Sequence, residues 1–215
     1  MIRLHHCPQT RSMRVLWLLH ELGLDFEVRE WPFDKSLRSA EFLALNPSGR
    51  VPAIELDGAL IWESGAIIEV LCERFPETGL GRPPEHPERA LFLTFVHFAE
   101  TISQHSAALT QQHIALYDDA MRSPVVMRIE AMRLEKCYLA LEGALGETLL
   151  PGGFSAADIA VGQAVYMARH FAPIDAHPKL AAWYDRLTRR DAFQASLPGP
   201  SRLYARDFYA PWDTQ

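Results

Sequence analysis

The stretch Ser48-Gly49-Arg50-Val51-Pro52-Ala53-Ile54, followed by Glu63-Ser64-Gly65, decides the predicted fold of the first part of this chain. The apolar run at 53–56 is predicted to be a strand, because a proline is tolerated where a strand begins and need not donate a ladder hydrogen bond. The turn at Asp57-Gly58 leads into a second strand at 60–62, which predicts a hairpin. Glu63-Ser64 then opens an apolar helical run.

Two features of this stretch predict a binding surface. The Val51-Pro52 bond can be cis at a cost of about 0.5–1 kcal/mol, so we expect Pro52 to turn the backbone of Val51 outward and leave an exposed edge. The helix that begins at Ser64 presents backbone N–H groups together with the Ser64 hydroxyl, and such a helix start binds a carboxylate. An exposed edge beside an anion-binding helix start suits a small peptide that carries carboxylates.

The first 76 residues predict alternating strands and helices. Besides the hairpin, the apolar patterns predict strands at 2–6 and 25–31 and helices at 11–22, 39–45 and 64–75. The resulting order, β-α-β-α-β-β-α, is the thioredoxin-like α/β layout, in which a parallel pair of strands is extended by an antiparallel pair. We therefore predict a thioredoxin-like N-terminal domain over residues 1–76.

The rest of the chain predicts a linker and an all-helical domain. Residues 77–87 are rich in proline, glycine and glutamate, which is typical of a connection between domains. Residues 88–215 form the predicted all-α C-terminal domain, with helices expected at 88–117, 125–145, 155–171 and 179–190. Ser155 and Asp158 have the spacing of a capping box at the start of the third of these helices.

Composition bounds the possible functions. The chain has 215 residues, is 48% apolar and 22% charged, and carries a net charge of −6 without a Lys/Arg cluster, which argues against a nucleic-acid partner. No apolar stretch approaches the ~20 residues that span a bilayer, and the N-terminus lacks signal-peptide features, so we expect a cytoplasmic protein without a membrane partner. The three cysteines and nine histidines have no metal-ligand spacing, so no metal site is expected.

The motif Asn46-Pro47-Ser48-Gly49-Arg50-Val51-Pro52, the Glu63-Ser64 pair and the loop Pro8-Gln9-Thr10-Arg11-Ser12-Met13-Arg14-Val15-Leu16-Trp17 together resemble the glutathione S-transferase family over about residues 1–195. The resemblance implies that Val51, before a cis Pro52, pairs with the cysteinyl backbone of glutathione. It implies that Glu63 and Ser64 hold the γ-glutamyl carboxylate and that Arg50 meets the glycyl carboxylate. Family members are usually homodimers, and Glu100 is the candidate acidic residue for the γ-glutamyl amine bound to the partner subunit.

The same resemblance implies an enzyme that activates the glutathione thiol. A hydroxyl at a helix N-terminus stabilises a thiolate, and we expect this group to be Thr10 first and Ser12 second. Because loop lengths before this helix differ between classes, Gln9 facing the sulfur is an open alternative. Residues Gln104, His105 and Tyr117, with Tyr204 and Phe208, are candidates for a pocket that takes a small hydrophobic electrophile.

Two other functions stay open at this point. Cys7-Pro8 is similar to the redox loop of glutaredoxins and of cysteine-type transferases, which would make the protein a glutathione-dependent thiol reductase or isomerase. Cys7 comes about two residues too early relative to the helix, and no second cysteine lies at CxxC spacing. A noncatalytic protein that binds glutathione on the same scaffold is the second alternative.

Overall fold

A mixed four-stranded sheet forms the first half of the molecule, in the order β2-β1-β3-β4. The computed structural model describes residues 1–199, 203–204 and 206–209. The strands are β1 (Ile2–His6), β2 (Glu27–Glu30), β3 (Ala53–Leu56) and β4 (Ala59–Trp62). β1 pairs with β2 in parallel and with β3 antiparallel, and β3 and β4 form the predicted hairpin. The thioredoxin-like order predicted from the sequence is confirmed.

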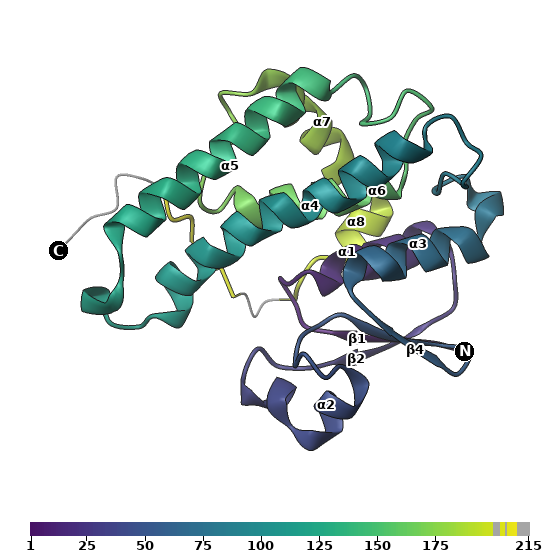
Figure 1. Ribbon diagram of the computed structural model, residues 1–215, viewed down its shortest axis with the longest axis horizontal. Helices are drawn as coiled ribbons and strands as arrows, with labels where there is room; N and C mark the ends of the chain where they lie inside the picture. The colour runs from purple at the N-terminus through teal and green to yellow at the C-terminus, as the bar shows by residue number, and fades with distance from the viewer. Residues whose placement is uncertain (200–202, 205, 210–215) are drawn as a thin grey trace.

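Helices cover both faces of this sheet (Figure 1). Helices α1 (Ser12–Glu21) and α3 (Ser64–Arg74) lie between the sheet and the long helices of the second half, whereas α2 (Ala40–Leu45) lies on the opposite face. α1 is almost wholly buried because apolar side chains occupy most of its positions. On the other face, Trp31, Leu37 and Phe42 form a small separate core under α2.

The second half is helical throughout, as predicted, and its central element is α6 (Ala156–Ala168). The other helices are α4 (Arg89–Thr110), α5 (Pro124–Ala144), α7 (Pro178–Thr188) and the unpredicted short α8 (Asp191–Ala195). Short turns of 3-10 helix occupy Lys35–Arg38, Pro76–Thr78 and Asp119–Met121, and a π turn occupies Gln111–Ala115. The helix expected to reach 117 therefore ends at Thr110, where the backbone widens into the π turn.

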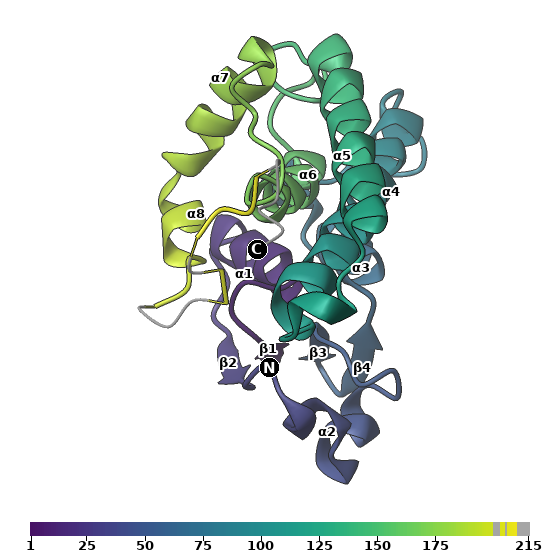
Figure 2. The same ribbon diagram turned by 90° about the vertical axis from the view of Figure 1, so that its left-hand side faces the viewer.

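α6 is buried from end to end among the other helices (Figure 2). It packs mainly against α4 and also against α1 of the sheet half. A Cβ at Gly162 would lie 2.7 Å from the end of the Leu187 side chain and 3.2 Å from the ring of Trp17, so any larger residue here would force these side chains to shift. Apolar side chains from both halves thus form one continuous core.

The segment between the two halves is packed rather than loose. Leu80 and Arg82 are both buried, and the Leu80 carbonyl accepts a hydrogen bond from the backbone of Ala156. Arg82 is paired with Glu88, whose carboxylate also accepts from the backbone of Gly152. The linker boundaries 77–87 stay a prediction, because composition marks where a helix is absent and not where a domain ends.

The predicted capping box at α6 is present and is extended by further donors. The Asp158 carboxylate accepts from the backbone N–H of Ser155 at 2.9 Å, from that of Leu149 at 3.0 Å and from the indole of Trp183 at 3.0 Å. Asp158 itself is fully buried. One carboxylate therefore satisfies three buried donors from three segments of the helical half.

Replacing Asp158 with alanine is expected to destabilise the fold by about 3 kcal/mol, because the cap is lost and buried donors remain without acceptors. Urea unfolding followed by circular dichroism measures the change. The matched control is Asp185→Ala at an exposed position on α7, for which we expect about 0.5 kcal/mol or less. An Asp158→Ala protein as stable as the control would contradict the role assigned to this carboxylate.

Candidate functional site

Three loops meet at one edge of the sheet. His5 of β1 lies opposite Ala53 of β3, and Ala53 lies opposite Trp62 of β4. The chain leaves β1 just after His5, enters β3 just before Ala53 and leaves β4 just after Trp62. Because the strands are in register, the three loops emerge side by side. They carry the residues predicted to bind glutathione, which are Thr10 and Ser12, Arg50 to Pro52, and Glu63 and Ser64.

Thr10 and Ser12 form a hydroxyl cluster at the start of α1. The Thr10 hydroxyl lies 2.8 Å from the Ser12 hydroxyl and 2.7 Å from the carbonyl oxygen of Cys7. Ser12 is fully buried, whereas Thr10 is only partly buried. The Thr10 carbonyl accepts from the side chain of Gln163 on α6, which ties this loop to the helical half. Of the two hydroxyls, Thr10 is the one that a bound molecule can reach.

The loop before β3 leaves backbone groups available. Within the described part of the chain, neither the N–H nor the carbonyl of Val51 has a hydrogen-bond partner, and the bond to Pro52 is cis. The side chain of Asn46 donates to the carbonyl of Arg50 at 2.6 Å and accepts from the backbone of Ser48, which holds this loop in place. Arg50 itself is exposed. This is the geometry that the sequence predicts for pairing with a peptide backbone.

The start of α3 is shaped by an unusual backbone conformation. Glu63 has φ of 74° and ψ of 114°, in a region that side chains other than glycine rarely adopt. Its carboxylate side chain is exposed, while Ser64 is buried as the first residue of the helix. Strained residues of this kind persist where the surrounding structure holds them and cluster at binding sites.

A buried guanidinium lies beneath this helix start. Arg14 is completely buried and donates to Gln163 at 3.0 Å, to Ser103 at 2.9 Å and to Ser64 at 3.3 Å. It also forms an ion pair with Glu100 of α4, whose other carboxylate oxygen lies 3.2 Å from Arg11. The signal for this cluster in the sequence is weak. Arg14 is a charged residue inside an apolar helix, but no neighbouring residue in the sequence indicates which side chains it pairs with.

Glu100 lies in the site of its own chain. The sequence predicted that it serves a glutathione bound to the partner subunit, but its carboxylate also lies 3.4 Å from the Ser64 hydroxyl of the same chain. Although burial by itself raises the pKa of this carboxyl, Arg14 and Arg11 outweigh it and lower the pKa below 4.5. An ionised carboxylate therefore stands next to Ser64 at neutral pH.

Gln9 is committed to contacts inside the protein. Its side-chain nitrogen donates to the hydroxyl of Tyr166 at 3.1 Å, and its side-chain oxygen accepts from the backbone of Tyr204 at 3.0 Å. The side chain is buried, and φ at Gln9 is 52°. This arrangement joins the loop before α1 to α6 and to the described part of the C-terminal segment. It favours Thr10 over Gln9 as the group that faces a bound thiol.

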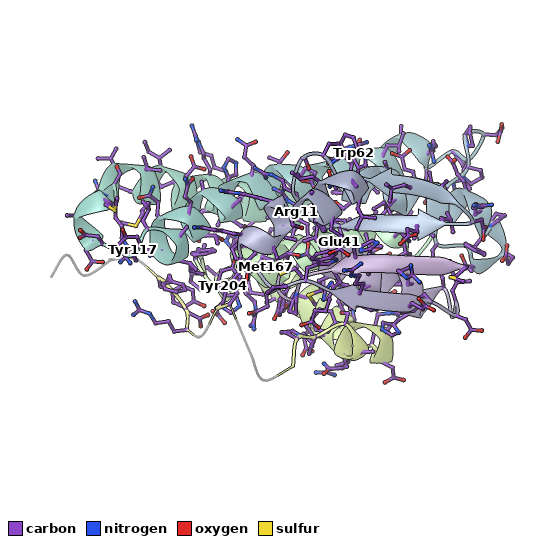
Figure 3. The ribbon with its side chains drawn as sticks, turned by 90° about the horizontal axis from the view of Figure 1, so that it is seen from below. Arg11, Glu41, Trp62, Tyr117, Met167 and Tyr204 are labelled. Carbon is purple, nitrogen blue, oxygen red and sulfur yellow. The ribbon has the colours of Figure 1, made fainter. Side chains whose placement is uncertain are left out.

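The residues expected to line an electrophile pocket do not come together. Tyr117 is 88% exposed and lies at the end of the molecule far from Arg11 (Figure 3). Gln104 is exposed on α4, whereas His105 is buried and its Nδ1 lies 2.6 Å from the carboxylate of Glu130. His105 borders an open groove of about 250 Å³ between α4 and α5, which contains neither Gln104 nor Tyr117. These residues were chosen because they lie along one predicted helix, and the sequence does not specify which face of α4 is covered.

The two remaining candidates pack into the helical half. Tyr204 stacks on His170 and its hydroxyl lies 2.7 Å from that of Thr110. Phe208 stacks against Phe171. Both side chains therefore serve first to hold the C-terminal segment in place.

The Cys7 thiol decides how well the thiol-reductase alternative fits this loop. Cys7 is buried, and burial raises the pKa of its thiol to about 11, so the thiol stays protonated near neutral pH.

Among the residues that the structure describes, no group of three or more His, Cys, Asp or Glu side chains is placed to hold a metal ion. Over the same residues, none of the helices combines the length and apolar character needed to cross a membrane.

The chain is similar to known proteins over both halves. The model of the glutathione S-transferase N-terminal domain matches residues 6–74, and that of the C-terminal domain matches residues 107–186. Glutathione S-transferase 3 of Zea mays is 28% identical over 93% of this chain and 96% of that protein.

Solved structures resemble the whole fold. A glutathione transferase homologue from Lodderomyces elongisporus has a TM-score of 0.81 at 24% identity, covering 91% of this chain and 96% of that one. A sphingomonad glutathione S-transferase, solved in complex with glutathione, has a TM-score of 0.76 at 25% identity, with 91% and 96% covered. The two-part arrangement described above is therefore an established one.

The Glu100 ion pairs predict a pH-dependent contribution to stability. Because the folded-state pKa of Glu100 is lowered from 4.5, its contribution is fully present above about that pH and is lost as the pH falls through the folded-state pKa. We expect Glu100→Gln to destabilise the protein at pH 7 and to differ less from the wild type in acid. Urea unfolding of both proteins from pH 7 to pH 3 measures this, with exposed Glu85→Gln as the control. A difference that is constant over this range would contradict the assignment.

Proposed function

The chain belongs to the glutathione S-transferase family, and from this premise we propose that it is an enzyme that transfers the thiolate of glutathione to small hydrophobic electrophiles. The observation that carries the proposal is that Thr10, whose hydroxyl lies at the start of α1, is partly exposed. It lies at the same sheet edge as the unpaired backbone of Val51 and the start of α3 at Ser64. These are the groups that a bound tripeptide thiol needs.

Each part of glutathione is assigned a partner. The γ-glutamyl carboxylate binds the start of α3, with the Ser64 hydroxyl and the backbone N–H groups of its first turn as donors. Glu63 takes part in this subsite, and Glu100 meets the γ-glutamyl amine of a glutathione bound to the partner subunit. The cysteinyl backbone pairs with Val51 beside Pro52. Arg50 is exposed at the end of this edge and pairs with the glycyl carboxylate. The sphingomonad relative bound to glutathione supports the choice of ligand.

The chemical step needs a thiolate at neutral pH. The Thr10 hydroxyl donates a hydrogen bond to the sulfur, and the N-terminus of α1 adds a positive potential, so both lower the pKa of the bound thiol. The thiol proton leaves to solvent. The sulfur then donates its electron pair to an electrophilic carbon, where a C–S bond forms and either a leaving group departs with its electrons or an adjacent atom takes a proton from water.

The two alternatives differ in what they need from the loop before α1. A thiol reductase needs a reactive cysteine, and the burial of Cys7 with its raised pKa opposes that role. A noncatalytic binding protein needs only the contacts to the tripeptide and would bind glutathione without lowering its thiol pKa. The test of the proposal is therefore the thiol pKa of bound glutathione together with turnover.

Replacing Thr10 with valine is expected to lower kcat by about 10- to 100-fold, because the donor to the thiolate is lost while the shape is kept. The affinity for glutathione should change by no more than about threefold, since the contact matters only once charge has developed on sulfur. Steady-state kinetics with an aryl halide and calorimetric titration with glutathione give the two values.

The matched control is Thr10→Ser, which keeps the hydroxyl and should retain most of the turnover. If Thr10→Val turned over as fast as wild type, Thr10 would not be the thiolate's partner. If the wild type bound glutathione with an unshifted thiol pKa, the binding-protein alternative would replace the enzyme.

We propose that the active form is a homodimer. Large apolar side chains are exposed on β4, at Leu60 and Trp62, and on α5, at Ile129, Met132 and Leu139. Stable interfaces bury about 1,200–2,000 Å² in total and are enriched in such side chains. Sedimentation equilibrium should give the mass of two chains at micromolar concentration, and Trp62→Glu should shift the mass toward one chain. A wild-type mass of one chain at that concentration would contradict the proposal.

A further inference from the structure

A buried histidine lies directly behind the hydroxyl cluster. The Nδ1 atom of His6, the last residue of β1, lies 2.8 Å from the Ser12 hydroxyl oxygen. That oxygen in turn lies 2.8 Å from the Thr10 hydroxyl. His6 is 4% exposed, so it cannot reach a bound substrate itself. The three side chains form an ordered row from the interior of the sheet half to the partly exposed surface at Thr10.

The Ser12 hydroxyl has more polar neighbours than the number of hydrogen bonds that a hydroxyl can make. Besides His6 and Thr10, it accepts from the backbone N–H of Cys7 at 3.0 Å and lies 3.1 Å from the carbonyl of Cys7. A hydroxyl has one hydrogen to donate and two lone pairs with which to accept. One lone pair is taken by the Cys7 N–H. The protonation of His6 Nδ1 therefore decides where the Ser12 hydrogen points.

The two neutral forms of His6 have opposite consequences. If Nδ1 lacks a hydrogen, Ser12 donates to it and accepts from Thr10, so the Thr10 hydrogen points inward. If Nδ1 carries the hydrogen, Ser12 accepts from it and donates to Thr10. The Thr10 hydrogen then goes to another acceptor, which is the Cys7 carbonyl at 2.7 Å in this structure and the sulfur when glutathione is bound. Only the second form gives a chain of hydrogen bonds that all run toward a developing thiolate, and such chains strengthen each member.

His6 is uncharged in either case. Burial lowers the pKa of His6 to about 4. The titratable groups nearest to it along the chain are His5 and Cys7, and Glu30 is its register partner on β2. The charged residues at the start of α1 are Arg11, just before the helix, and Arg14 in its first turn, and both are paired with Glu100. A neutral imidazole that carries one hydrogen is therefore the species behind Ser12.

We propose that His6 is a positioning residue for the reaction and that its Nδ1–H directs the hydroxyl hydrogens of Ser12 and Thr10 toward the sulfur of bound glutathione. This rests on the proposed function, in which Thr10 donates to the thiolate. His6 does not accept the thiol proton. It keeps Ser12 donating to Thr10 before the substrate arrives, so that only the Thr10 hydrogen has to turn, from the Cys7 carbonyl to the sulfur.

The test compares two substitutions at position 6. His6→Asn places an amide N–H close to where Nδ1 lies and keeps a donor to Ser12, whereas His6→Leu has no donor. With His6→Leu we expect the thiol pKa of bound glutathione, read from thiolate absorbance, to rise by about one unit, which is a roughly tenfold smaller thiolate fraction below that pKa. His6→Asn should restore most of the wild-type value. Glutathione affinity should stay within about threefold for both variants.

A control separates this effect from general disturbance of β1. His5 is buried on the same strand but bonds to Trp31 and to Glu55 and touches neither hydroxyl. His5→Leu should lower stability without moving the thiol pKa. If His6→Leu and His6→Asn both kept the wild-type thiol pKa, or if His5→Leu raised it equally, His6 would have only a structural role and the proposal would be overturned.

A spectroscopic measurement on the wild type does not depend on how the variants fold. Long-range ¹H–¹⁵N correlation of ¹⁵N-histidine-labelled protein with glutathione bound distinguishes the two tautomers, and the His6→Asn spectrum assigns the signal. A hydrogen on Nδ1 supports the proposal, and a hydrogen on Nε2 overturns it. A wild type that lowers the thiol pKa with the Nε2 form would refute the role of His6 alone, whereas an unshifted wild-type pKa would refute the proposed function as well.

Discussion

The ion pair of the buried Arg14 guanidinium with Glu100 is the interaction on which the rest of this structure depends. A charge without solvent is costly unless opposite charge and hydrogen-bond acceptors surround it. Here these groups come from Glu100 and Ser103 of α4, from Ser64 of α3 and from Gln163 of α6. Because three helices must converge on one side chain of a fourth, satisfying the charge fixes how the sheet half meets the helical half. It also places Ser64 at the sheet edge where the three loops meet.

The junction between the halves is consequently the site itself. Gln163 bonds both to Arg14 and to the carbonyl of Thr10, so the same helix that compensates the buried charge also holds the hydroxyl loop. Gln9 adds a second tie, to Tyr166 of α6. The apolar core is continuous across the junction. Motion of one half relative to the other would therefore disturb the loop that carries Thr10, because Gln163 of α6 donates to its backbone.

The loop after β1 carries two groups that could take part in thiol chemistry, the Cys7 thiol and the Thr10 hydroxyl, and their surroundings differ. Cys7 is buried and its thiol is held protonated, whereas three residues later the Thr10 hydroxyl is partly exposed. Burial disfavours a thiolate on the protein, while a hydroxyl at a helix start favours one on a ligand. The buried Ser12 and His6 behind Thr10 add direction to that hydroxyl without being accessible themselves. The loop therefore suits the proposed function, in which the sulfur belongs to the bound substrate and not to the protein.

The sequence by itself determined the element order, the capping box of α6 and the place of Thr10, Val51 and Ser64, because each depends on residues a few positions apart or on the period of apolar residues. Tertiary structure alone decided that Glu100 pairs with Arg14 of its own chain and that the Gln9 side chain donates to Tyr166. It also decided that Tyr117 is exposed and lies far from Arg11 (Figure 3). The Arg14–Glu100 and Gln9–Tyr166 pairings join residues many positions apart, and no local pattern encodes which face of one helix meets another. Which polar side chains become partners is set only when the buried charge and the apolar faces are satisfied together.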